Sequence, residues 1–287
     1  MEIPKMRELL EAGVHFGHQV KRWNPKMAGY IFAARDGIHV LDLAVTVSEL
    51  EKACEFLKNV ASDGGKVVFL GTKRQAQPII IEEAQRAGTM FVVNRWIGGL
   101  LTNFECVSKR IERMEDLEAK KERGEFGDLT KKEQLLIDRE IEKLNRLYGG
   151  VRGLRKLPDA LFVVDVKKEI CAVREAKKRE VPVVAICDTN ADPDFVDFPI
   201  PGNDDAIKSI KILVEAAANA VLEGKGVWEK RKVEGERKMA KNREEVESVQ
   251  VKNDPTSPKL RGAGEQEVIS KKAAPVKTAT KKRRKEK

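Results

Sequence analysis

The stretch "DALFVVDVKKEICAVREAKKREVPVVAIC", residues 159–187, contains two apolar runs separated by a charged segment. Each run is rich in Val, Ile and Phe without regular polar alternation, which is typical of strands covered on both faces of a sheet. The charged segment between them has the pattern of an amphipathic helix. A strand, a helix and a second strand in this order predict two parallel strands of one sheet.

The same alternation extends over most of the chain. After a helix-like start, residues 30–43 read as two short strands about an Asp36-Gly37 turn, and residues 46–65 as a helix ending at a Gly-Gly pair. Strands and helices then alternate over residues 66–71, 76–88, 90–95, 159–166, 169–180, 181–187 and 204–224. We therefore predict one α/β domain over residues 1–226, a doubly wound parallel sheet with helices on both faces.

The alternation is interrupted at residues 105–148, which are highly charged. Apolar residues recur there every three or four positions, and Gly124 and Gly127 break the pattern in the middle. This predicts an inserted antiparallel hairpin of two helices, with a narrow seam like that of a coiled coil. We interpret it as an arm for a protein partner, with a packed surface hairpin as the alternative. The seam residues assigned to protein docking are Val107, Ile111, Met114, Ile137 and Ile141.

Charge is distributed unevenly along the chain. Residues 229–287 contain 19 Lys and Arg against 10 Asp and Glu, so they carry the whole net charge of +9. Because the remainder is neutral, any polyanion must be bound there by local basic patches. Residues 227–287 are predicted to form a charged, net basic and largely disordered tail. It either tethers RNA loosely or is a solvated extension without function.

Composition also indicates the compartment. The start of the chain lacks the apolar block of a signal peptide, and no run approaches the roughly 18 apolar residues of a membrane span. The four cysteines are scattered and form no CxxC pair. We therefore expect a chain with free thiols, without a membrane segment, in a reducing cytoplasm.

Signals for an enzyme are weak. No GxGxxG follows a strand and no GxxxxGK[ST] occurs, so no nucleotide cofactor is expected. In "FLGTKRQAQ", residues 69–77, Lys73 and Arg74 precede a helix whose N-terminus suits a phosphate. A nucleotide-dependent enzyme therefore stays only as a competing hypothesis.

The sequence contains residue types that could bind a metal ion. His15 and His18, together with Asp188, Asp192 and Asp194 after the last apolar run, have the ligand types of a divalent ion. The alternative is a polar loop shaped by Asx turns. We assign no metal.

Two loops carry the strongest functional signal. "HQVKRWNPKM", residues 18–27, and "NRWIGGLLTN", residues 94–103, each place a tryptophan beside an arginine. Cations neutralise phosphates, amides and hydroxyls reach sugar and backbone oxygens, and an indole face stacks on a base or supports an arginine. Glycines let the backbone approach closely. The alternative for each tryptophan is a lid over the core.

Three segments carry a family resemblance. "LLEAGVHFGHQVKRWNPKM" at 9–27, "NRWIGGLLTNF" at 94–104 and "PDALFVVDVKKEICAVREAKKREVPVVAICDTNADP" at 158–193 resemble the bacterial form of the second protein of the small ribosomal subunit. The similarity extends from residue 1 to about 226, including the charged hairpin. It implies a flavodoxin-like domain with an inserted coiled-coil hairpin, and a structural constituent of the ribosome, without catalysis or cofactor. It also implies binding to small-subunit rRNA between head and body, and docking of the first small-subunit protein.

The resemblance places the RNA contacts on the two loops, with less specific support for the residues after the strand at 66–71. The chain is expected to be a monomer within the ribosome, and a docking scaffold based on the hairpin is compatible with this function. The expected RNA-binding residues are Lys21, Arg22, Trp23, Asn24, Lys26, Lys73, Arg74, Asn94, Arg95, Trp96, Gly98, Gly99, Thr102 and Asn103.

Overall fold

A computed structural model describes residues 3–253 of the chain. The chain divides into two units, Met1–Glu236 and Arg237–Lys287. The strands are β1 (Phe16–Gln19), β2 (Ile31–Arg35), β3 (Ile38–Leu41), β4 (Val67–Leu70), β5 (Met90–Val92), β6 (Ala160–Val164), β7 (Val183–Cys187) and β8 (Phe198–Pro201). The α-helices are α1 (Met6–Glu11), α2 (Leu43–Ser62), α3 (Gln77–Arg86), α4 (Phe104–Glu122), α5 (Lys131–Tyr148), α6 (Ile170–Lys178) and α7 (Ile207–Asn253). Short 3-10 helices are η1 (Val20–Arg22), η2 (Pro25–Tyr30), η3 (Gly149–Val151) and η4 (Pro193–Phe195).

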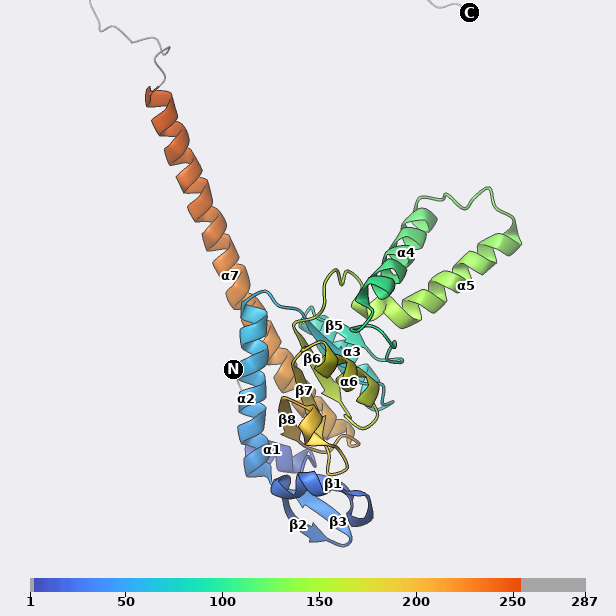
Figure 1. Cartoon of the computed structure of the whole chain (residues 1–287), viewed down its shortest axis with the longest axis vertical. Coiled ribbons are helices and arrows are strands. Elements are labelled where there is room, and N and C mark those ends of the chain that lie inside the picture. The colour runs from blue at the N-terminus through green and yellow to red at the C-terminus, as the bar shows by residue number, and fades with distance from the viewer. Residues whose placement is uncertain (1–2, 254–287) are drawn as a thin grey trace, which may run out of the picture. The chain divides into compact units, whose positions relative to one another are not determined.

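The larger sheet has five parallel strands in the order β5-β4-β6-β7-β8 (Figure 1). Renumbered from β4, this is the strand order 2-1-3-4-5 of a flavodoxin-like fold. Every residue of β4, β6 and β7 is buried, as their continuous apolar sequences predict. The predicted α/β architecture with a parallel sheet is therefore confirmed.

One strand of this sheet was not expected from the sequence. β8 has the sequence FPIP and pairs only with β7, at the edge of the sheet. Proline has no N–H to donate to a ladder, so its presence argues against a strand in the interior of a sheet but is tolerated at an edge.

The smaller sheet is antiparallel, in the order β1-β3-β2, and follows α1 in the chain (Figure 1). β2 and β3 are joined by Asp36 and Gly37, with φ of 51° and 76°. These left-handed conformations suit a two-residue hairpin, and they confirm the predicted turn. β1, within "VHFGHQ", was not expected, because it is short and only partly buried.

The parallel sheet separates two hydrophobic cores. Alternate residues of β4 point to opposite faces. Val67 and Phe69 join a core with α2, α3 and α7, where Phe69 and Phe162 lie with ring centroids 4.9 Å apart. Val68 and Leu70 join a second core with α6 and the start of α4. Helices therefore cover both faces of the parallel sheet, as the sequence predicts.

The insertion consists of α4 and α5, of 19 and 18 residues. α5 begins with a capping box in which Thr130 and Glu133 bind each other's backbone N–H groups. Ion pairs cross between the two helices, Arg113 to Glu140 at 2.9 Å and Lys121 to Asp138 at 2.7 Å. Two packed helices are therefore observed, while a coiled-coil seam stays a prediction.

The domain boundary near residue 226 also stays a prediction. α7 does not end at Gly226 but continues to Asn253. The basic cluster predicted at the chain end lies outside the described residues. Among residues 3–253, no helix combines the length and apolar character needed to cross a bilayer.

Candidate nucleic-acid interface

The first basic loop, residues 18–27, contains η1 and the start of η2. The Asn24 side chain accepts the Lys26 N–H at 3.1 Å, and the Asn24 N–H donates to the Thr189 carbonyl at 2.7 Å. These bonds fix the backbone against the end of β7, while Lys21 and Arg22 point into solvent. The loop therefore presents two cations on an anchored backbone.

Trp23 is the aromatic residue of this loop. Its side chain is 37% exposed, and its ring lies 5.1 Å from the ring of buried His39 in β3. The indole thus contacts the small sheet, and part of the ring is accessible to a stacking partner.

Lys26 differs from the other loop cations. Its ammonium lies 2.9 Å from Asp192 and 2.6 Å from Asp194, at η4. Hydrogen bonds to Asp192 and then Asp194 raise its pKa above the ordinary value. Because its charge is already matched, Lys26 serves to attach the loop to η4.

The second loop, residues 94–103, is organised by one carboxylate from α6. Oε1 of Glu175 accepts the Trp96 indole N–H at 3.1 Å and the Gly99 N–H at 2.9 Å. Oε2 accepts the Leu101 N–H, the Thr102 N–H and the Thr102 hydroxyl, each at 3.2 Å. Burial alone would raise the pKa of Glu175, but these hydrogen bonds outweigh it and lower the pKa.

Burial divides the second loop into two sets of residues. Trp96 is only 8% exposed and packs in the second core, so it supports the loop from inside. Asn94, Arg95, Gly98 and Asn103 are exposed. Asn94 donates to the Arg146 carbonyl at 2.6 Å, which ties the loop to the end of α5.

Gly98 and Gly99 of this loop are explained by different features of the structure. Gly99 has a φ of +90°, which disfavours other residues, and its N–H is needed by Glu175. A Cβ at Gly98 would meet no atom within 4 Å. Gly98 therefore leaves open space on the surface, which fits close approach of a ligand.

Lys73 and Arg74, the two cations after β4, lie in different environments. Arg74 is exposed. The Lys73 ammonium instead lies 2.7 Å from Asp204, 2.8 Å from Asp205 and 3.0 Å from Asp165. Lys73 is largely buried, and its pKa is raised, since the nearby carboxylates outweigh the effect of its burial. Of the two, only Arg74 has a charge free of an ion pair in the described part of the chain.

Lys73 and Asp165 also occupy a special place in the fold. They follow β4 and β6, the neighbouring strands at which the strand order reverses. Doubly wound folds bind small ligands outside the carboxyl ends of such strands. Here that position contains an ion-paired cluster of protein side chains.

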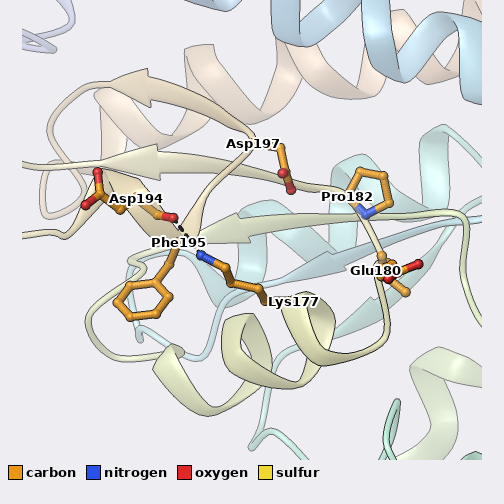
Figure 2. Close-up of a pocket in the computed structure, with 7 residues that line it drawn as sticks. Lys177, Glu180, Pro182, Asp194, Phe195 and Asp197 are labelled. Carbon is orange, nitrogen blue, oxygen red and sulfur yellow. Dashed lines mark hydrogen bonds between the residues drawn. The ribbon is translucent and has the colours of Figure 1, made fainter.

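Sequence reasoning missed the basic face of α6. Arg174, Lys177 and Lys178 are exposed on this helix. Figure 2 shows Lys177 beside Phe195 and Asp194: its ammonium lies 5.2 Å from the Phe195 ring centroid and donates to the Asp194 carbonyl at 3.1 Å. The run "REAKKR", with cations three and four positions apart, is the signal that could have identified this face.

α6 links the two loops. Its Glu175 binds the second loop, and Lys177 contacts η4, to which Lys26 of the first loop is paired. Met27 and Trp96 from the two loops both pack in the second core. Exposed cations therefore occur on both loops and on the helix that connects them; we name this set the loop–α6 surface: Lys21, Arg22, Arg95, Arg174, Lys177 and Lys178.

The hairpin residues assigned to docking are also divided by burial. Val107, Ile111 and Met114 of α4 are buried in the second core and are not accessible to a partner. Ile137 and Ile141 of α5 are partly exposed. For the three α4 residues the structure indicates packing against the body, because α4 begins directly at the sheet.

The residues considered for a metal are rearranged in a similar way. His18 lies beside Asp188, whereas Asp192 and Asp194 are paired with Lys26. His15 is apart from this cluster, and burial lowers its pKa. Asp204, absent from the sequence-based set, joins His18 and Asp188 instead.

Residues 9–224 match the family described as Ribosomal protein S2. The match covers well over half of the chain and includes both basic loops, the hairpin and all five parallel strands.

Proposed function

The chain belongs to the ribosomal protein S2 family, and we propose that it binds small-subunit rRNA through the loop–α6 surface. Family membership implies a structural, non-enzymatic protein of the small ribosomal subunit. The proposal adds where on the protein the RNA is bound and which side chains are free to bind it.

Accessible charge is the observation that carries the proposal. Lys21, Arg22 and Arg95 of this surface are exposed and form no ion pair within the described residues. The same is true of Arg74, which follows β4 and is a further candidate outside this surface. Trp23 adds a partly exposed aromatic ring that contacts His39. Because the body has no net positive charge, such local cations must supply the attraction to phosphate. Folded RNA buries most base edges, so recognition is expected to follow shape and phosphate position.

Three residues expected to contact RNA receive other roles in this proposal. Lys26 and Lys73 neutralise carboxylates, and Trp96 fills the core beneath the second loop. Their substitution should therefore act through folding of the site. The exposed loop cations should act through affinity.

We further propose that the protein lies between the head and body of the subunit, and that the hairpin docks the first small-subunit protein. The support is the family resemblance, together with two large apolar side chains on α5. Leu135 and Leu136 are 50% and 54% exposed. Exposed leucines on a projecting helix are suited to a hydrophobic groove of a partner.

A competition assay tests the RNA surface. Arg95→Ala combined with Lys21→Ala should reduce incorporation into small subunits, while the melting temperature stays within about 2 °C of wild type. Lys208→Ala with Lys211→Ala removes the same charge from exposed positions of α7 and serves as the control. Equal incorporation of both double variants would refute the assignment.

Salt dependence provides a second test. For RNA fragments of the small subunit, log affinity should fall linearly with log salt, and the slope should decrease by roughly 0.7–0.9 per lost phosphate contact in the loop variant. A slope unchanged from wild type would mean that these two cations do not contact phosphates.

The docking role is tested separately. Leu135→Ser with Leu136→Ser should abolish capture of the first small-subunit protein without changing RNA affinity. Point variants are preferable to deletion of the hairpin, because deletion would remove buried Ile111 and Met114. Retention of the partner by the double variant would contradict the proposal.

A further inference from the structure

We propose that His18, Asp188 and Asp204 form a binding site for one zinc ion at the carboxyl ends of β7 and β8. One ligand atom from each residue lies within 4.8 Å of the others. Nitrogen and carboxylate oxygen are ligands that Zn²⁺ accepts in a four-coordinate site, with water as the fourth ligand. This inference does not depend on RNA binding.

The first support is an oxygen without a hydrogen-bond donor. Asp188 is 1% exposed, and its Oδ1 accepts the Thr189 N–H. Its Oδ2 accepts no hydrogen bond from the described residues, although it lies 2.9 Å from Nδ1 of His18. A buried carboxylate oxygen left in this way is costly, and a cation would remove the cost.

The second support is an excess of negative charge. Among the described residues, the cluster contains the carboxylates of Asp165, Asp188, Asp204 and Asp205, whereas its cationic groups are Lys73 and His18. Four carboxylates therefore face two cationic groups even when the histidine is protonated.

The third support is the orientation of the histidine. Nδ1 faces Asp188, and Nε2 lies 3.5 Å from Oδ2 of Asp205. A metal-bound histidine commonly presents its second nitrogen to a carboxylate, which orients the ring and strengthens its basicity. Asp205 is positioned for that role.

The presence of a histidine selects the metal. Mg²⁺ prefers oxygen ligands and retains several waters, whereas imidazole suits Zn²⁺. Lys73 binds Oδ1 of Asp204 at 2.7 Å. Binding would connect β1, which carries His18, to the ends of β7 and β8. The same region fixes the first basic loop through Thr189.

Zinc titration of the full chain, stripped with a chelator, tests the proposal. All variants carry Cys106→Ser and Cys171→Ser, because these exposed thiols would bind zinc independently. Competition with a chromophoric indicator should show one bound equivalent, and Asp188→Asn should weaken it at least about tenfold. Asparagine retains the oxygen that binds Thr189. His18→Gln should give the same loss.

Two controls make the outcome decisive. Asp192→Asn, in the same loop but paired with Lys26, should keep wild-type zinc affinity. Millimolar Mg²⁺ should not displace zinc. In the presence of chelator, Asp188→Asn should melt no lower than its parent, since it removes one carboxylate from a cluster that has more carboxylates than cations; with zinc, only the parent should gain stability. Less than one equivalent in the parent, displacement by Mg²⁺, or full binding by Asp188→Asn would overturn the site.

Discussion

Replacement of Glu175 by glutamine isolates the carboxylate that organises the second loop. Glutamine keeps one acceptor oxygen, which can retain Trp96 and Gly99, but turns an NH2 group toward three donors of Leu101 and Thr102. Hydrogen bonds to a charged group contribute up to about 3 kcal/mol each, and solvent access to this half-buried side chain reduces that value. At about 1 kcal/mol for each of the three lost bonds, the free energy of unfolding should fall by about 2–4 kcal/mol.

The assay is urea and thermal unfolding followed by circular dichroism, with tryptophan fluorescence as a local probe. For a unit of this size the expected fall in melting temperature is about 4–16 °C. Acrylamide quenching should increase, because the loop around Trp96 loses the three hydrogen bonds that Leu101 and Thr102 donate to Glu175. Glu55→Gln, exposed on α2, removes the same charge and should change stability by less than about 0.5 kcal/mol.

The pH dependence gives an independent check of the cause. The folded state lowers the pKa of Glu175 below its ordinary value of 4.5. Its contribution is therefore fully present above pH 4.5 and is lost as the pH falls through the folded-state pKa. The stability difference between wild type and Glu175→Gln should be constant at neutral pH and shrink in acid. Equal stability of the Glu175 and Glu55 variants at neutral pH, with unchanged quenching, would refute the reasoning.

Other substitutions test separate parts of the structure. Lys73→Met should lower the free energy of unfolding by about 3–5 kcal/mol, since it removes the cation of a buried carboxylate cluster; a urea midpoint equal to wild type would exclude this structural role. Gly150→Ala should destabilise by about 1–3 kcal/mol, because its Cβ would collide with a backbone carbonyl, as differential scanning calorimetry can show. Gly98→Ala should leave the melting temperature unchanged but reduce RNA affinity, and equal affinity would argue against close approach there. Maleimide labelling of the native protein, read by mass spectrometry, should modify Cys106 and Cys171 only, because burial raises the pKa of the other two thiols.

The fold was accessible to sequence reasoning because its determinants are local. Continuous apolar runs indicated β4, β6 and β7, helical periodicity indicated α4 and α5, and Asp36-Gly37 indicated a hairpin turn. The exceptions were weak in local signal. β8 is rich in proline, and β1 is short and half-exposed, so neither has the usual pattern of a strand.

The candidate site was only partly accessible in this way. Both loops were identified by composition, and their exposed cations form part of the proposed surface. The sequence could not distinguish Lys73 from Arg74, which are adjacent and equally basic. The difference arises from Asp204, which is 131 positions away and contacts only the first of them.

What the sequence alone determined is thus the alternation of the central strands and helices, the charged hairpin and the presence of two cationic, aromatic loops. These follow from hydrophobic periodicity and residue type, which act over a few neighbouring positions. Only the tertiary structure decided which polar groups are neutralised, buried or free. It brought Glu175 into hydrogen bonds with a loop 73–79 positions earlier in the chain, and it brought His18 next to Asp188. Such partners are selected by how chain segments meet in space, and the strength of each charge then depends on the burial that this meeting creates.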